Sequence, residues 1–113
     1  MATPESKVKA AVVKLLKAND VYYFFPATGG YGRSGVPDII ACVKGRFVAI
    51  ECKANGNKPT ELQLRELHKI HKAGGITFVI DEAGVPLIAK LMEVAGNWSE
   101  PHDSIEGDQN ACE

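Results

Sequence analysis

Two acidic residues and a lysine are spaced so that they could share a metal ion. Lys44-Gly45 separates two apolar runs rich in β-branched residues, which predicts a β-hairpin with these two residues as its turn. In that register Asp38 lies directly opposite Glu51, and the alternation of side chains along a strand puts Lys53 on the same face. Opposed carboxylates repel each other, so the pattern predicts a cation between them. A longer turn or a bulge would shift this register.

The same three residues have the groups needed to hydrolyse a phosphodiester. Mg²⁺ and Mn²⁺ prefer oxygen ligands, which the carboxylates of Asp38 and Glu51 supply. A cation held there would lower the pKa of a water molecule and neutralise charge on phosphoryl oxygens. Lys53 would orient or deprotonate the attacking water. The alternative is a solvated ion-pair network on a polar sheet face, and the apolar neighbours of both acids argue against it.

The segments around these residues resemble a known nuclease signature. Pro37-Asp38 followed by Glu51-Cys52-Lys53 resembles the P-D…(D/E)-x-K pattern of the PD-(D/E)XK nucleases, and SGVPDII with AIECK is most similar to the VRR-NUC (virus-type replication-repair nuclease) branch. The resemblance covers residues 4–80. It implies that the backbone carbonyl of Cys52 is a further metal ligand and that cleavage leaves a 5′-phosphate and a 3′-hydroxyl.

The resemblance also implies a substrate and an assembly. It implies a Mg²⁺- or Mn²⁺-dependent DNA endonuclease that acts on branched DNA, such as four-way (Holliday) junctions. A chain of this length offers no separate DNA-recognition domain, which fits recognition of DNA shape by a symmetric homodimer. A flap or nicking nuclease of the same fold and a non-cleaving DNA-binding module are the alternatives. A metal-dependent cleavage assay separates the binding module from the nucleases.

Two residues near predicted helix starts have both a structural and a functional interpretation. Thr3-Pro4-Glu5 predicts the start of a helix that runs to about Ala18. Glu5 is either there because the helix dipole stabilises a carboxylate in the first turn or, as the resemblance implies, turned toward the metal. Thr60 and Gln63 fit a capping box at the start of a second helix. The resemblance also places a glutamine at this point, near the reacting phosphate, and the two roles of Gln63 are compatible.

Two predicted loops carry candidate DNA-binding residues. Residues 27–35 contain four glycines, and Arg33 and Ser34 in this loop could contact a DNA backbone. A plain flexible connector is equally compatible with the composition, and no P-loop is present. Residues 54–59 form a second loop, predicted to be exposed, in which Lys58 is a third candidate.

The predicted order of elements is α-β-β-β-α-β-α, with a first strand over 21–25 and a fourth over 76–80. A hairpin followed by a helical crossover predicts an α/β fold with a four-stranded mixed sheet flanked by helices. With the resemblance, this is a restriction-endonuclease-like core plus a C-terminal helix over 86–95. That last helix either packs on its own sheet or forms a dimer interface.

Length and composition favour a single intracellular domain. A chain of 113 residues that is 45% hydrophobic can form one modest core, predicted to span residues 1–96. Its apolar runs are too short for a membrane span, and no secretory signal precedes them. An odd number of cysteines (Cys42, Cys52 and Cys112) predicts reduced thiols, and His68 and His71 lack a third metal ligand. We therefore expect a cytoplasmic protein of a bacterial or phage-infected cell.

Charge is divided unevenly along the chain. The net charge is −1, but residues 97–113 hold five of the 14 acidic residues and no lysine or arginine. The remaining 1–96 therefore carry 13 basic and nine acidic residues, which gives a body of charge +4 that could hold phosphate. The polar, acidic 97–113 segment is predicted to be a mobile tail.

Overall fold

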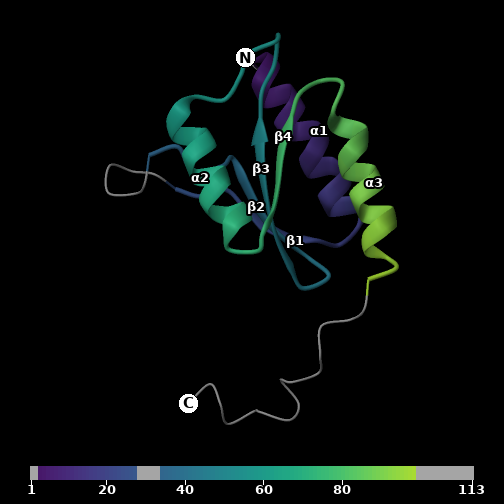
Figure 1. Ribbon diagram of the computed structural model, residues 1–113. Helices are drawn as coiled ribbons and strands as arrows, with labels where there is room; N and C mark the ends of the chain where they lie inside the picture. The colour runs from purple at the N-terminus through teal and green to yellow at the C-terminus, as the bar shows by residue number, and fades with distance from the viewer. Residues whose placement is uncertain (1–2, 28–33, 99–113) are drawn as a thin grey trace.

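A four-stranded sheet forms the middle layer of the protein in the computed structural model, which describes residues 3–27 and 34–98 (Figure 1). Its spatial order is that of the sequence, and the first two pairings are antiparallel whereas the last is parallel. This confirms the predicted mixed sheet. The strands are β1 (Tyr22–Phe24), β2 (Ile39–Val43), β3 (Arg46–Cys52) and β4 (Ile76–Ile80).

The turn between β2 and β3 has the geometry that the sequence predicts. Lys44 and Gly45 both have positive φ angles, 49° and 82°, as a two-residue type I′ turn requires. Val43 pairs with Arg46 and the register continues without a bulge to the far end of β2. One further step along this register places Asp38 opposite Glu51.

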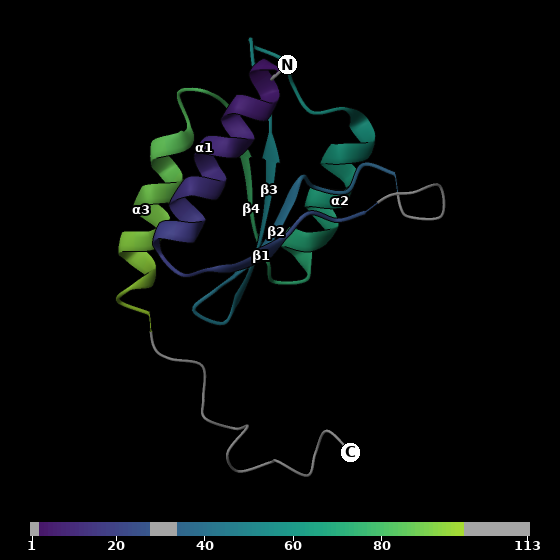
Figure 2. The ribbon, with the colours of Figure 1, turned by 180° about the vertical axis from the view of Figure 1, so that it is seen from behind.

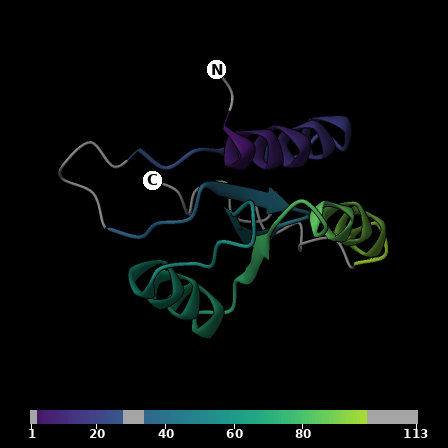
Figure 3. The ribbon, with the colours of Figure 1, turned by 90° about the horizontal axis from the view of Figure 1, so that it is seen from above.

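Three helices cover the two faces of the sheet (Figure 3). α1 (Pro4–Ala18) and α3 (Val85–Ala95) pack side by side on one face, and α2 (Glu61–Lys72) lies on the other. Both predicted N-caps form: the Thr3 hydroxyl oxygen accepts from the Ser6 N–H, and Thr60 makes a complete capping box. β1 is shorter than the predicted 21–25, because it is an edge strand that pairs with only three residues of β2.

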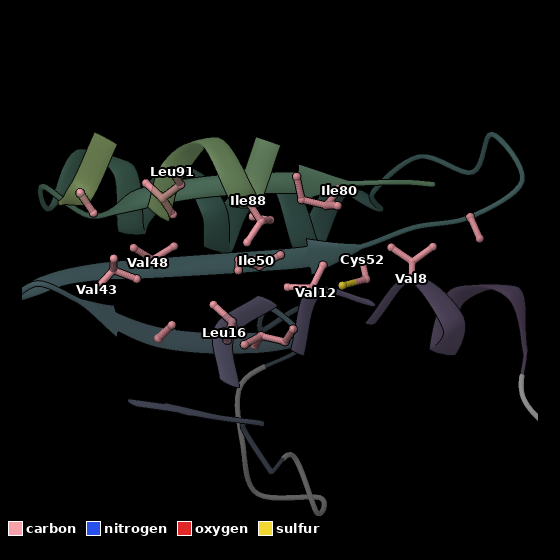
Figure 4. Close-up of a cluster of buried hydrophobic side chains, with 14 residues drawn as sticks. Val8, Val12, Leu16, Val43, Val48, Ile50, Cys52, Ile80, Ile88 and Leu91 are labelled. Atoms are coloured by element: carbon pink, nitrogen blue, oxygen red, sulfur yellow. The ribbon is translucent and has the colours of Figure 1, made fainter. Parts of the chain in front are cut away.

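The larger core lies between the sheet and the pair α1 and α3 (Figure 4). Val48, Ile50 and Cys52 of β3 point into it, and α3 contributes Ile88, Leu91 and Ala95. Packing on its own sheet therefore accounts for the apolar face of α3. Trp98 also packs against this core, and the guanidinium of Arg46 lies 4.8 Å from the centroid of its ring. Residues 99–113 of the predicted acidic tail lie outside the described residues.

A smaller apolar cluster lies under α2. Ile40 and Ala49 of the sheet contact Leu67 and the partly buried Ile70 of that helix. The helix ends at Lys72 and is followed by Gly74, whose φ of 102° suits glycine, as the predicted stop requires. None of the helices in the described part of the chain has the length and apolarity needed to cross a bilayer.

One end of the molecule gathers the termini of several elements. Two opposite views show the first turn of α1, the start of α2 and the C-terminal end of β3 at the same end of the sheet (Figures 1 and 2). β4 runs parallel to β3, and its last residue, Ile80, accepts the N–H of Lys53 at 2.9 Å. Polar residues at this end can therefore meet even when they are far apart in the sequence.

Candidate metal and catalytic centre

Strand alternation places Glu51 and Cys52 on opposite faces of β3. Ile50 and Cys52 belong to the core under α1 and α3, whereas Ala49 packs under α2. Glu51 therefore points to the α2 face, yet it is only 1% exposed. An acid buried to this extent at a strand end needs a compensating partner.

Three carboxylates converge at this point. One oxygen each from Glu5, Asp38 and Glu51 lies within 4.8 Å of the other two. Glu5 comes from the first turn of α1, ahead of Val8, the first buried residue of that helix. The structure thus brings together the two acids predicted from the hairpin and the glutamate whose orientation the sequence left open.

Lys53 is the cation beside this cluster. Its Nζ atom lies 3.3 Å from Oε2 of Glu51 and 3.8 Å from Oε1 of Glu5. Lys53 is 9% exposed and Glu51 is 1% exposed, so their ion pair is poorly solvated, whereas the side chain of Glu5 is 49% exposed. The predicted common face of Asp38, Glu51 and Lys53 exists.

Asp38 is fixed by the strand that it faces. Its Oδ2 atom accepts a hydrogen bond of 2.8 Å from the N–H of Cys52. This bond ties the loop before β2 to the backbone between Glu51 and Lys53. Only Oδ2 is used in it, so the second oxygen of Asp38 can face the cluster.

Burial shifts the pKa of two neighbouring groups. Burial, reinforced by the charge of Asp38 and opposed by Lys53, raises the pKa of Glu51 to about 7. Burial also raises the pKa of the Cys52 thiol to about 12, an effect that Asp38 and Glu51 reinforce and Lys9 opposes. A thiol of that pKa is protonated and unreactive, as the prediction of a core cysteine requires.

The donor set fits a hard divalent cation. Among the described residues, Oε1 of Glu51 is buried and has no hydrogen-bond partner. Buried carboxylate oxygens are rarely left in this way, and Mg²⁺ and Mn²⁺ bind oxygen ligands of this kind. The unsatisfied oxygen, the convergent acids and the raised pKa of Glu51 are all features that a bound cation would relieve.

Gln63 performs the structural role predicted for it. Its Oε1 atom accepts the N–H of Thr60 at 2.9 Å, and its own N–H donates to the Thr60 hydroxyl oxygen at 3.2 Å. The side-chain amide NH₂ is not used in this capping box. A role for Gln63 near a phosphate remains a prediction.

Two of the three candidate DNA-binding residues belong to the described part of the chain. Ser34 and Lys58 are exposed, the first in a turn before β2 and the second in the loop after β3. Arg33 lies outside the described residues. The loop of Lys58 is held by Glu82, whose Oε2 atom accepts the N–H of Asn55 at 3.0 Å.

Two residues near the centre are not evident from sequence patterns. Gly35 has a φ of +78°, and a Cβ atom on it would lie 2.5 Å from the backbone carbon of Leu62 at the start of α2. The absence of a side chain at Gly35 therefore lets the segment that leads to Asp38 pack closely against the start of α2. Lys9 places its Nζ atom 4.0 Å from the centroid of the Phe25 ring. Its position four residues after Glu5 indicates only that the two residues share one side of α1.

Comparison with known proteins identifies the family. Residues 22–100 match the family model of the archaeal Holliday junction resolvase (Hjc). The protein named "Putative nuclease p44", from Acyrthosiphon pisum secondary endosymbiont phage 1, is 37% identical over 78 residues, covering 68% of this chain and 81% of the relative. A solved VRR_NUC domain superposes with a TM-score of 0.65 at 27% identity, covering 81% of this chain and 97% of that domain. These matches confirm the resemblance to the VRR-NUC branch, and the chain belongs to the archaeal Holliday junction resolvase family of PD-(D/E)XK nucleases.

Proposed function

We propose that this nuclease is a metal-dependent endonuclease that hydrolyses phosphodiester bonds in branched DNA, such as four-way junctions. The observation that supports it most strongly is the convergence of Glu5, Asp38 and Glu51 within 4.8 Å, with the Lys53 ammonium beside them. Membership of a family described by junction resolvases favours branched DNA over other substrates.

Asp38 and Glu51 would hold the cation, since both carboxylates face the same point and Glu51 has a buried oxygen to offer. Glu5 and the backbone carbonyl of Cys52 would complete the protein ligands. A bound Mg²⁺ or Mn²⁺ ion supplies Lewis-acid chemistry and offsets negative charge on the phosphate. Hard oxygen ligands alone do not select between these two metals.

The residues of the chain orient the reactants. Lys53, 3.3 Å from Glu51, is placed to donate a hydrogen bond to an attacking water or to a non-bridging phosphate oxygen. Asp38 is locked by the Cys52 N–H, so its free oxygen keeps a fixed direction. The unused amide of Gln63 would donate to a phosphate oxygen from the start of α2. Because Glu51 is only 1% exposed, little solvent would compete with the cation for its carboxylate.

DNA binding and assembly complete the proposal. Arg33, Ser34 and Lys58 would contact the DNA backbone around the centre. A homodimer with two-fold symmetry would present two identical sites to a two-fold junction, as paired incisions require. On α3, Leu87 and Val94 lie seven residues apart and are about half exposed, which keeps the outer side of this helix available for such an interface.

The test is cleavage of labelled four-way, flap, duplex and single-stranded DNA by the purified protein. We expect paired cuts in the four-way junction with Mg²⁺ or Mn²⁺, and none with EDTA or with the Asp38→Asn variant. Equal cleavage of plain duplex would refute the preference for branched DNA. Cleavage in EDTA would refute the metal dependence.

A further inference from the structure

Lys9 is a cation near the centre to which the proposed mechanism gives no role. It is half-buried on α1, and its Nζ atom lies 4.0 Å from the centroid of the Phe25 ring. That distance is well within the range of a cation–π interaction. Phe25 follows β1 directly and leads into the glycine-rich segment 27–35. The contact thus joins α1 to the entrance of that segment.

Helical geometry puts Lys9 next to the carboxylate cluster. Residues four apart on a helix are neighbours on one face, so Lys9 lies one turn beyond Glu5 on the same side of α1. The carboxylate of Glu5 is within 4.8 Å of those of Asp38 and Glu51. A ligand that spans one helical turn along α1 from the metal centre would therefore meet the ammonium of Lys9.

The charge balance of the centre explains why a cation is needed there. Three carboxylates and one ammonium repel an anionic backbone until a metal ion offsets them. Additional positive charge beside the cluster reduces this repulsion for the flanking phosphates. An aromatic ring, unlike a carboxylate, has no net charge, so Phe25 holds the ammonium in place without cancelling it.

The site is also open on this side. Phe25 is 49% exposed, and its ring lies 5.9 Å from that of Tyr23, centroid to centroid, at an angle of 50°. One part of the ring is therefore supported from within the protein while another faces solvent. The Phe25 ring and part of Lys9 are therefore both accessible from solvent.

We infer that Lys9, held by Phe25, binds a phosphate of the DNA backbone that flanks the phosphate at which the strand is cut. This inference rests on the proposed function and adds a contact on the α1 side of the centre. Lys9 is a DNA-binding residue in this scheme and takes no part in the chemistry. Replacing Lys9 should therefore change the affinity for DNA and the salt dependence of that affinity. The rate at which the bound complex cleaves DNA should stay unchanged.

The experiment compares Lys9→Gln with Lys14→Gln, because Lys14 is an exposed lysine on the same helix. Binding to a labelled four-way junction is followed by fluorescence anisotropy in EDTA between 50 and 200 mM salt. We expect Lys9→Gln to reduce the slope of log K against log salt by about 0.9, the loss of one phosphate contact. Its single-turnover rate at saturating protein with Mg²⁺ should equal that of the wild type. Lys14→Gln should leave slope and rate unchanged.

A slope for Lys9→Gln equal to that of Lys14→Gln would overturn the inference, provided that both variants keep the melting temperature of the wild type. A lower single-turnover rate at saturation would also overturn it, because it would place Lys9 in the chemistry. Phe25→Leu tests the support: we expect weaker binding with the charge retained, and wild-type affinity would remove Phe25 from the scheme. Cleavage by the wild type tests the proposed function separately, since the salt slopes are measured without turnover.

Discussion

Replacing Glu51 by glutamine is expected to stabilise the metal-free protein at neutral pH while abolishing catalysis. Glu51 is buried, and its pKa lies near 7 in place of the ordinary 4.5. The folded protein therefore holds a proton on this group, between these two pH values, that the unfolded chain has released. Stability from this proton is complete below about pH 4.5 and is lost as the pH rises through 7.

The difference between the two pKa values sets the size of the effect. One pKa unit corresponds to about 1.4 kcal/mol, so deprotonating Glu51 in the folded, metal-free protein costs about 3 kcal/mol. Glutamine keeps the shape of the protonated acid and does not titrate. The free energy of unfolding of Glu51→Gln should therefore exceed that of the wild type by about 3 kcal/mol at pH 8, and the two should agree near pH 4.

Urea unfolding in EDTA at constant ionic strength, from pH 4 to pH 8, measures this difference directly. Other titrating groups are common to the two proteins, so the subtraction isolates Glu51. Addition of Mg²⁺ at pH 8 should restore stability to the wild type and have much less effect on the variant. Parallel stability profiles for the two proteins in EDTA would refute the burial argument, and an equal effect of Mg²⁺ on both would refute a role for Glu51 in holding the metal.

Three further predictions follow from the geometry. Lys53→Ala should lower the cleavage rate at least about 100-fold, while calorimetry still detects Mn²⁺ binding; loss of binding would instead make Lys53 part of the metal site. Gly35→Ala should lower the free energy of unfolding in urea by about 3 kcal/mol, because positive φ and overpacking both oppose a Cβ there. The matched control is Gly56→Ala, with a φ of +75° and open space, which should cost only about 1 kcal/mol; equal losses would remove the packing argument. With the other two cysteines replaced by serine, Cys52 should react with a thiol reagent only on unfolding, whereas rapid reaction of the native protein would contradict its burial.

Features of this fold that depend on local sequence could be predicted from it. The Lys44-Gly45 turn fixes its own register, because a two-residue type I′ turn leaves one pairing for the residues on either side. The caps at Thr3 and Thr60 use side chains within three residues, and both form. The relation of Asp38 to Glu51 follows from the same local geometry. A large part of the centre was therefore predictable because a single hairpin carries it.

Features that depend on distant contacts could not be predicted in the same way. The sequence around Glu5 was compatible with a carboxylate at the helix start and with one turned toward the metal, and its spacing favoured neither. The position of α1 over the sheet decides between them. Gly35 belongs to a glycine-rich loop by composition, yet its role comes from the backbone of Leu62 in another element. Trp98 was assigned to the acidic tail, but it packs on the core and under Arg46. The boundary of that tail remains a prediction.

The two-residue turn also limits how this gene can vary in length. Side chains change faces at every residue of a strand, so a one-residue insertion in β3 before Glu51 would bring Ile50 to the metal centre and turn the acid into the core. A two-residue insertion would keep the face but carry the acid roughly 7 Å past Asp38. The number of residues between the turn and the acid therefore has to stay constant for the centre to form, whichever residues fill those positions. Length variation among related genes should fall instead in segments 27–35 and 54–59. No residue of these segments is paired in the described sheet, so an inserted residue there would not change which face a strand side chain points to.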